Sequence, residues 1–126
     1  MALAEPRVHP SAALRRTPRL WAWLFQRVSG PVLFVLALGH VAWLVVFRDV
    51  GDLTYADVVA RWSSGLWRAW DWLLLVGAIA HGVIGGRSVV EDHVRGARGR
   101  FVAVAVLVVT GAVLLSVGTV VTLTVG

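Results

Sequence analysis

Cysteine and lysine are both absent from this sequence of 126 residues. Without cysteine the chain cannot form a disulfide, ligate an iron–sulfur cluster through thiolates or offer a thiol nucleophile, so any redox group has to be held by histidine. Charge is also scarce, because only 15% of the residues are charged whereas 58% are hydrophobic. This composition is too apolar for a soluble domain and is typical of an integral membrane protein.

Three long stretches lack charge almost completely. Residues 28–47 and 101–126 contain no charged side chain, and residues 72–90 contain only Arg87. Each stretch approaches or exceeds the roughly 20 residues needed to cross a bilayer. The sequence therefore predicts an all-α integral membrane protein, with an N-terminal tail (1–20) and one membrane domain (21–126) whose three transmembrane helices run over about 21–47, 70–93 and 100–125.

The twelve basic residues, all of them arginine, lie where membrane topology would put them. They are concentrated before the first apolar stretch and in the turn between the second and third, whereas the loop after the first stretch mixes arginine with aspartate. The positive-inside rule then makes the N-terminal tail cytoplasmic and the C-terminus external. The net charge of +5 reflects this topology, and no nucleic-acid partner is expected.

Smaller features refine this picture. Residues 57–62 have the amphipathic character of a short helix on the membrane surface. Tryptophans near residues 21–23 and 62–72 are expected to anchor the two interfaces. Small residues in the third stretch predict close packing with another helix; they are Ala105, Ala112 and Thr119, with Gly111 and Gly118 beside them.

Two histidines fall inside apolar stretches, where an ionisable side chain asks for a partner or a role. A neutral buried imidazole can ligate haem iron or form a hydrogen bond between helices. Around His81, glycines at 82, 85 and 86 leave room for a flat macrocycle or for a close backbone, which favours haem. His40 lies about 16 Å along its helix from Ser29, at a depth expected to resemble that of His81. It could ligate a second haem, complete the first or be structural.

Polar groups gather at the cytoplasmic ends of the first two helices. Asp92 and His93 close the second helix, where they could supply protons to a docked ligand or form a solvated helix end. Arg87 could reach a haem propionate or the headgroups. Arg27 and Ser29 open the first helix as a headgroup anchor or as an anion or quinone contact. If the two helices are antiparallel neighbours, Asp92, His93, Arg27 and Ser29 should converge.

Five segments together carry a family resemblance: WLFQRVSG at 23–30, LALGH at 36–40, ARWSS at 60–64, Trp70-Asp71, and the pattern His81-x3-Gly85-x-Arg87-x4-Asp92. They resemble the membrane-anchor subunits of succinate dehydrogenase (succinate:quinone oxidoreductase), most closely the D-type anchors of actinobacterial-type complexes. The resemblance covers roughly residues 21–101. Its most specific part is the spacing of eleven from histidine to aspartate, joined to Arg-x-Ser-Gly on the preceding helix.

The resemblance implies haem b. In this family the histidine of the second helix is an axial ligand, which assigns that role to His81, usually with the second ligand from the companion anchor subunit. Members with two haems also use a histidine of the first helix, which makes His40 a candidate ligand. One or two haems are therefore expected.

The resemblance also implies a quinone, either menaquinone or ubiquinone, near Asp92. In the family this aspartate is usually followed by a tyrosine that hydrogen-bonds a quinone carbonyl, and here that position is His93, whose imidazole could donate instead. Arg27 and Ser29 match the segment that contacts quinone or a haem propionate in related anchors.

The implied function is that of an anchor without a succinate-oxidising site of its own. Succinate would be oxidised in a flavoprotein subunit, and electrons would cross an iron–sulfur subunit to quinone at the cell inner (cytoplasmic) membrane. The expected partners are these two subunits, the companion anchor and membrane lipid. The alternatives are a fumarate reductase anchor and a cofactor-free scaffold or small transporter, in which His40 and His81 would form hydrogen bonds between helices. Small transporters generally carry acidic residues inside the membrane, and none lies deep here.

Overall fold

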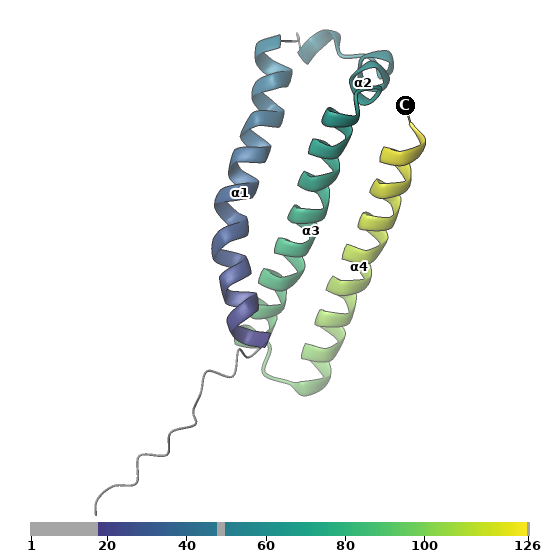
Figure 1. The fold of residues 1–126 in the computed structure, drawn as a ribbon. Helices are drawn as coiled ribbons and strands as arrows, with labels where there is room; N and C mark the ends of the chain where they lie inside the picture. The colour runs from purple at the N-terminus through teal and green to yellow at the C-terminus, as the bar shows by residue number, and fades with distance from the viewer. Residues whose placement is uncertain (1–17, 48–49, 126) are drawn as a thin grey trace, which may run out of the picture.

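The computed structural model describes residues 18–47 and 50–125 and is helical throughout this part, with no strand (Figure 1). Its elements are α1 (Pro18–Phe47), the short 3-10 helix η1 (Val50–Asp52), α2 (Tyr55–Trp62), α3 (Gly65–His93) and α4 (Ala97–Thr124). Three stretches are long and apolar enough to cross a membrane: Leu20–Val46, Gly65–His93 and Ala97–Thr124. The predicted all-α fold with three membrane helices is confirmed, whereas the side of the membrane on which each end lies stays a prediction.

Each long helix begins earlier than the apolar pattern predicted. α1 starts at Pro18, because the fixed φ of proline suits a first helical turn, and it takes in the last residues of the predicted tail. The rest of that tail, residues 1–17, lies outside the described residues. α3 starts at Gly65 instead of residue 70, and α4 at Ala97 instead of residue 100. Arginine in these first turns lowers hydropathy but is a good helix former, so the helix outruns the apolar stretch.

The short helix expected in the first loop is present as α2. Its start is stabilised by the carboxylate of Asp57, which accepts hydrogen bonds from the backbone N–H of Thr54 at 3.0 Å and from its hydroxyl at 2.6 Å. Apolar and polar residues alternate at helical spacing along α2, as predicted. The helix packs on α3.

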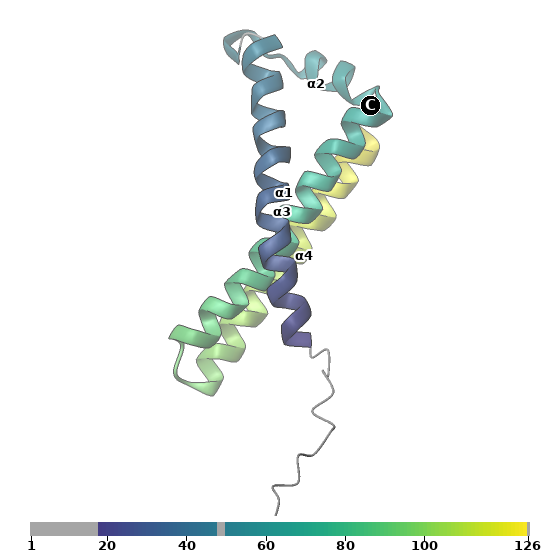
Figure 2. The same ribbon diagram turned by 60° about the vertical axis from the view of Figure 1, so that its left-hand side comes forward.

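α3 is the central helix of the molecule. Both α1 and α4 pack against it, and α4 runs alongside α3 in both views while α1 crosses them at a steeper angle (Figures 1 and 2). The chain passes down α3 and back up α4 through a short turn, so neighbours in sequence are antiparallel neighbours in space. A side chain on α3 can therefore face α1 or α4, and its position around the helix decides which of the two helices supplies its polar partners.

Glycines allow α3 and α4 to approach closely. A Cβ on Gly111 would lie 2.7 Å from a methyl of Val83, one on Gly118 would lie 2.5 Å from Leu75, and one on Gly86 would lie 2.9 Å from Leu107. Each helix thus receives branched side chains of the other over a glycine. The predicted close packing of the third span is confirmed. Gly111 and Gly118 contact α3, and the hydroxyl of Thr119 accepts a hydrogen bond from Nε1 of Trp72 at 3.2 Å, whereas Ala112 is exposed.

The described residues enclose no hydrophobic core. None of their apolar side chains is buried, and large ones such as Phe34 on α1 and Phe101 on α4 are 68% and 75% exposed. Lipid tails are as apolar as these side chains, so such exposure costs nothing inside a membrane. The three long helices leave most of their surface for lipid or for other protein chains.

Candidate functional site

The imidazole of His81 lies between α3 and α1. Its Nδ1 is 2.7 Å from the hydroxyl oxygen of Ser29 on α1, and both residues are half-buried. Gly30 of α1 also faces the ring, and a Cβ there would lie at an ordinary van der Waals distance of 3.8 Å from Cε1 of His81. One ring nitrogen is therefore held, while Nε2 has no hydrogen-bond partner among the described residues.

The backbone of His81 is held by the same helix. Gln26, one turn before Ser29, donates from Nε2 to the His81 carbonyl at 2.7 Å. Its carboxamide lies over Gly85, where a Cβ would be 3.2 Å from Oε1 and 3.3 Å from Nε2. Gln26 was quoted in the sequence pattern without a role, and the available signal was its position on the same helix face as Ser29.

The glycines near His81 therefore serve different purposes. Gly85 admits Gln26 of α1 and Gly86 admits Leu107 of α4, so these two provide the close backbone approach that the sequence left as an alternative. Gly82 has nothing within 4 Å of the place that a Cβ would occupy. Open space is thus found at Gly82 alone among the three, at a point about 100° around the helix from His81.

His40 belongs to a separate cluster at the α2 end of the bundle. Its Nδ1 is 3.0 Å from Oδ1 of Asp71 near the start of α3. The same carboxylate accepts hydrogen bonds from Nη2 of Arg61 at 2.9 Å and, through Oδ2, from Nε1 of Trp62 at 2.9 Å. One carboxylate therefore joins α1, α2 and α3.

Arg61 is the most enclosed charged group described, at 8% exposure. Its guanidinium carbon lies 4.4 Å from the ring centroid of Trp43 and 4.7 Å from that of Trp67, so the cation stacks on two indoles. Its Nε is buried without a hydrogen-bond partner. We call His40, Trp43, Arg61, Trp62, Trp67 and Asp71 the Arg61 cluster. The segments of the family resemblance contain four of these residues but not Trp43 or Trp67. Trp62 and Trp67 were expected only as interfacial anchors, and Trp43 had no predicted role.

The two histidines lie at different depths, contrary to the expectation. Ser29 contacts His81 and is therefore level with it, and His40 is eleven residues further along α1, which is about 16 Å. The expectation was wrong because it set Ser29 at the membrane edge, whereas α1 begins eleven residues earlier, at Pro18. His40 is consequently too far away to ligate the same iron as His81.

The predicted convergence of quinone-contacting residues is not observed either. Ser29 lies beside His81, and Asp92 is eleven residues, about 16 Å, further along α3. His93 bonds through Nδ1 to the Val89 carbonyl of its own helix at 3.0 Å. The guanidinium of Arg27 stacks on Trp23 at 4.7 Å. Asp92, His93 and Arg27 are all exposed.

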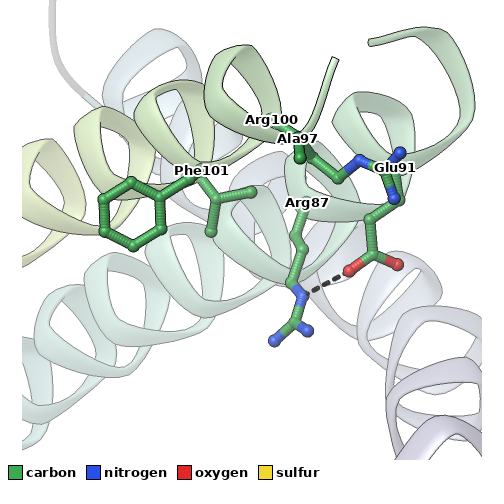
Figure 3. Close-up of a pocket in the computed structure, with 6 residues that line it drawn as sticks. Arg87, Glu91, Ala97, Arg100 and Phe101 are labelled. Carbon is green, nitrogen blue, oxygen red and sulfur yellow. Dashed lines mark hydrogen bonds and ion pairs between the residues drawn. The ribbon is translucent and has the colours of Figure 1, made fainter. Parts of the chain in front are cut away.

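Arg87 lies on the α4 side of α3, away from the face that His81 presents to α1. Its Nε is 2.8 Å from Oε1 of Glu91, and both line a cavity of about 420 Å³ between the ends of α3 and α4 (Figure 3). Arg100 and Phe101 of α4 line the other side. The structure thus separates Arg87 from the imidazole whose haem it was expected to assist.

Comparison with known proteins identifies the family of the chain. Residues 6–124 match the family described as the succinate dehydrogenase/fumarate reductase transmembrane subunit. The chain is also similar to the succinate dehydrogenase 2 membrane subunit SdhC of Mycobacterium tuberculosis, with 26% identity over 83 residues, which are 66% of this chain and 60% of the relative. The name of that relative denotes a C-type anchor, whereas the sequence was expected to resemble the D-type anchors most closely, so the anchor type stays a prediction. On the family match, the chain belongs to the transmembrane subunits of succinate dehydrogenase and fumarate reductase.

Proposed function

We propose that the chain is a membrane-anchor subunit of a succinate dehydrogenase and that its His81 is an axial ligand of haem b. The observation that carries the ligand assignment is the hydrogen bond between Nδ1 of His81 and Ser29. A metal-ligating histidine almost always has its other ring nitrogen held by a hydrogen-bonding group, which fixes the tautomer and the ring orientation. Held at Nδ1, the imidazole offers Nε2 to a metal.

The residues around His81 fit this group. The imidazole is half-buried, its Nε2 is without a partner in the described part of the chain, and the space at Gly82 is open. No other histidine, and no group of three or more metal-ligating side chains, surrounds it among the described residues. The second axial ligand would come from a companion anchor subunit packed on the exposed helix faces. A bound haem b would supply a one-electron carrier inside the membrane.

His40 offers the same kind of ligand at a different depth. Its Nδ1 is held by Asp71, which is the carboxylate–histidine arrangement common beside metals. Its separation from His81 means that it can serve only a second haem or the structure itself. A second haem is therefore proposed only as an outcome of the measurement below.

The quinone would dock at the far end of α3, where this chain contributes exposed groups. Asp92 and His93 stand free of α1 there, so a partner subunit has to complete the pocket. His93, or a water held by Asp92, would hydrogen-bond a quinone carbonyl and deliver a proton as the quinone is reduced. The companion anchor, the iron–sulfur subunit and the flavoprotein subunit are the partners that this role requires, in the inner membrane.

The reduced-minus-oxidised optical spectrum of the purified complex tests the haem assignment. His81→Ala should abolish or strongly reduce the b-type band, because it removes an axial ligand. His40→Ala should leave that band and should lower the haem-to-protein ratio only if two haems are bound. His93→Ala serves as a matched control and should leave the spectrum intact. An unchanged spectrum in the His81→Ala complex would overturn the assignment.

The quinone role is tested by two assays on the same complex. His93→Ala should slow quinone reduction, by roughly 10²- to 10³-fold if it is the only donor lost, and should leave succinate oxidation with a soluble artificial acceptor unchanged. His93→Tyr should retain substantial quinone activity, since the phenol can also donate. Quinone reduction at the wild-type rate in His93→Ala would mean that the donor belongs to a partner subunit. Comparing succinate oxidation with fumarate reduction decides the direction of the reaction.

A further inference from the structure

Gln26 makes a contact that the proposed haem site does not itself require. It donates to the carbonyl of His81, which as a helical carbonyl also receives the N–H of residue 85. Glycine at position 85 lets the carboxamide lie in this place, since a Cβ there would be 3.2 Å from Oε1 and would push it away by a few tenths of an ångström. Gln26 and Gly85 therefore form a matched pair across α1 and α3.

The contact also bears on the ring of His81. Gln26 and Ser29 are three residues apart on one face of α1, and they hold the backbone carbonyl and the ring nitrogen of the same residue at 2.7 Å each. Serine has a short side chain, so its bond to Nδ1 survives only while α1 and α3 stay at this spacing. The ring itself is held only at Nδ1, so turning it about its side-chain torsions breaks the Ser29 contact, while Gln26 holds the backbone from which the ring projects.

From these contacts we infer that Gln26 is a positioning residue for His81. It sets the spacing and register of α1 against α3 and so keeps Ser29 on Nδ1, with Gly85 kept small to admit its carboxamide. Gln26 touches neither Nε2 nor the space beside Gly82, so it acts on any metal only through His81. The inference rests on the proposed function for its effect on haem, whereas the contact between Gln26 and Gly85 stands without it.

A double-mutant cycle in the assembled complex tests the pair. Gly85→Ala should lower the melting temperature, because its methyl displaces the Gln26 carboxamide by a few tenths of an ångström. Adding Gly85→Ala to Gln26→Ala should have little further effect, since the group it displaces is gone. Gly86→Ala, whose added methyl meets Leu107 of α4 and not Gln26, is the matched control. Gln26→Ala should not rescue Gly86→Ala. Additive effects of Gln26→Ala and Gly85→Ala would refute the pairing.

The haem signal provides the readout that general packing would not move. Ser29→Ala should shift the haem midpoint potential and weaken haem retention, by about tenfold as for other lost partners of metal-ligating histidines. Gln26→Ala should shift the potential in the same direction by less, and should have no additional effect when Ser29 is already alanine. The inference would be overturned if Gln26→Ala left the midpoint potential unshifted. It would also be overturned if Gln26→Ala shifted the potential as much in the Ser29→Ala variant as in the wild type. A wild-type complex without a b-type band would instead refute the proposed haem, and the melting cycle would then decide the pairing alone.

Discussion

The bundle holds His81 and His40 by different kinds of group, His81 near the middle of α3 and His40 at the α2 end. His81 is held by two neutral groups, a hydroxyl and a carboxamide, and keeps one ring nitrogen available. His40 is held by Asp71, which is also committed to Arg61 and Trp62. The two neutral hydrogen bonds orient His81 and leave its Nε2 available to a ligand. The carboxylate of Asp71 instead joins α1, α2 and α3. We expect function to be lost by changes around His81 and assembly to be lost by changes in the Arg61 cluster.

The clearest contrast between the two ends of the bundle is the side of the membrane that each one faces. If the positive-inside rule holds, the Arg61 cluster lies at the external end and the α3–α4 turn at the cytoplasmic end. The chain has no cysteine of its own, so single cysteines at the exposed positions Ser63 and Gly96 can be labelled in intact cells with an impermeant maleimide. Ser63→Cys should be labelled and Gly96→Cys should not. Labelling of both, or of Gly96→Cys alone, would contradict the orientation.

The next effect concerns stability. Arg61→Ala should destabilise the folded chain by about 3–5 kcal/mol, because it leaves the mostly buried carboxylate of Asp71 without its cation. Thermal unfolding of the complex and the yield of assembled complex measure this. Arg98→Ala, which removes an exposed arginine, is the control and should change neither quantity. Equal melting temperatures for the two variants would show that the cluster is dispensable.

The smallest effect is expected at the cavity between α3 and α4. Glu91→Gln removes the ion pair with Arg87, whose guanidinium is largely exposed to solvent. Such an i,i+4 pair contributes roughly 0.3–0.5 kcal/mol and is screened by salt. Glu91→Gln should therefore shift the melting temperature by no more than about a degree and should leave the haem spectrum unchanged. A shift as large as that of Arg61→Ala would show that Glu91 contributes far more to stability than an exposed ion pair does.

The helices and the family could be predicted from the sequence, because both depend on local patterns. Apolar length gave three spans, amphipathic spacing gave α2, and the histidine, glycine and aspartate spacing on α3 pointed to the family that the comparison supports. Register could not be predicted in this way. Two apolar helices can be shifted along each other without any change in their hydropathy patterns. The residue of α3 that faces Ser29 therefore depends on the register of α1 against α3, which the pattern does not fix.

The Arg61 cluster was missed for a related reason. Its residues come from three elements, and no spacing within one helix relates Arg61 to His40 or Trp43. Gln26 was missed because a glutamine in a helix has no evident role until its neighbour across the interface is known to be glycine. Both cases need the packing of one helix on another, which the sequence does not encode locally.

The absence of buried apolar side chains among the described residues affects how this chain responds to temperature. For a soluble domain, unfolding transfers apolar surface into water and raises the heat capacity, which curves the free energy of unfolding with temperature. Here the helices would separate into lipid or detergent, and little new apolar surface would meet water. The free energy of separating α1, α3 and α4 should consequently vary almost linearly with temperature, and the bundle should show no tendency to come apart in the cold.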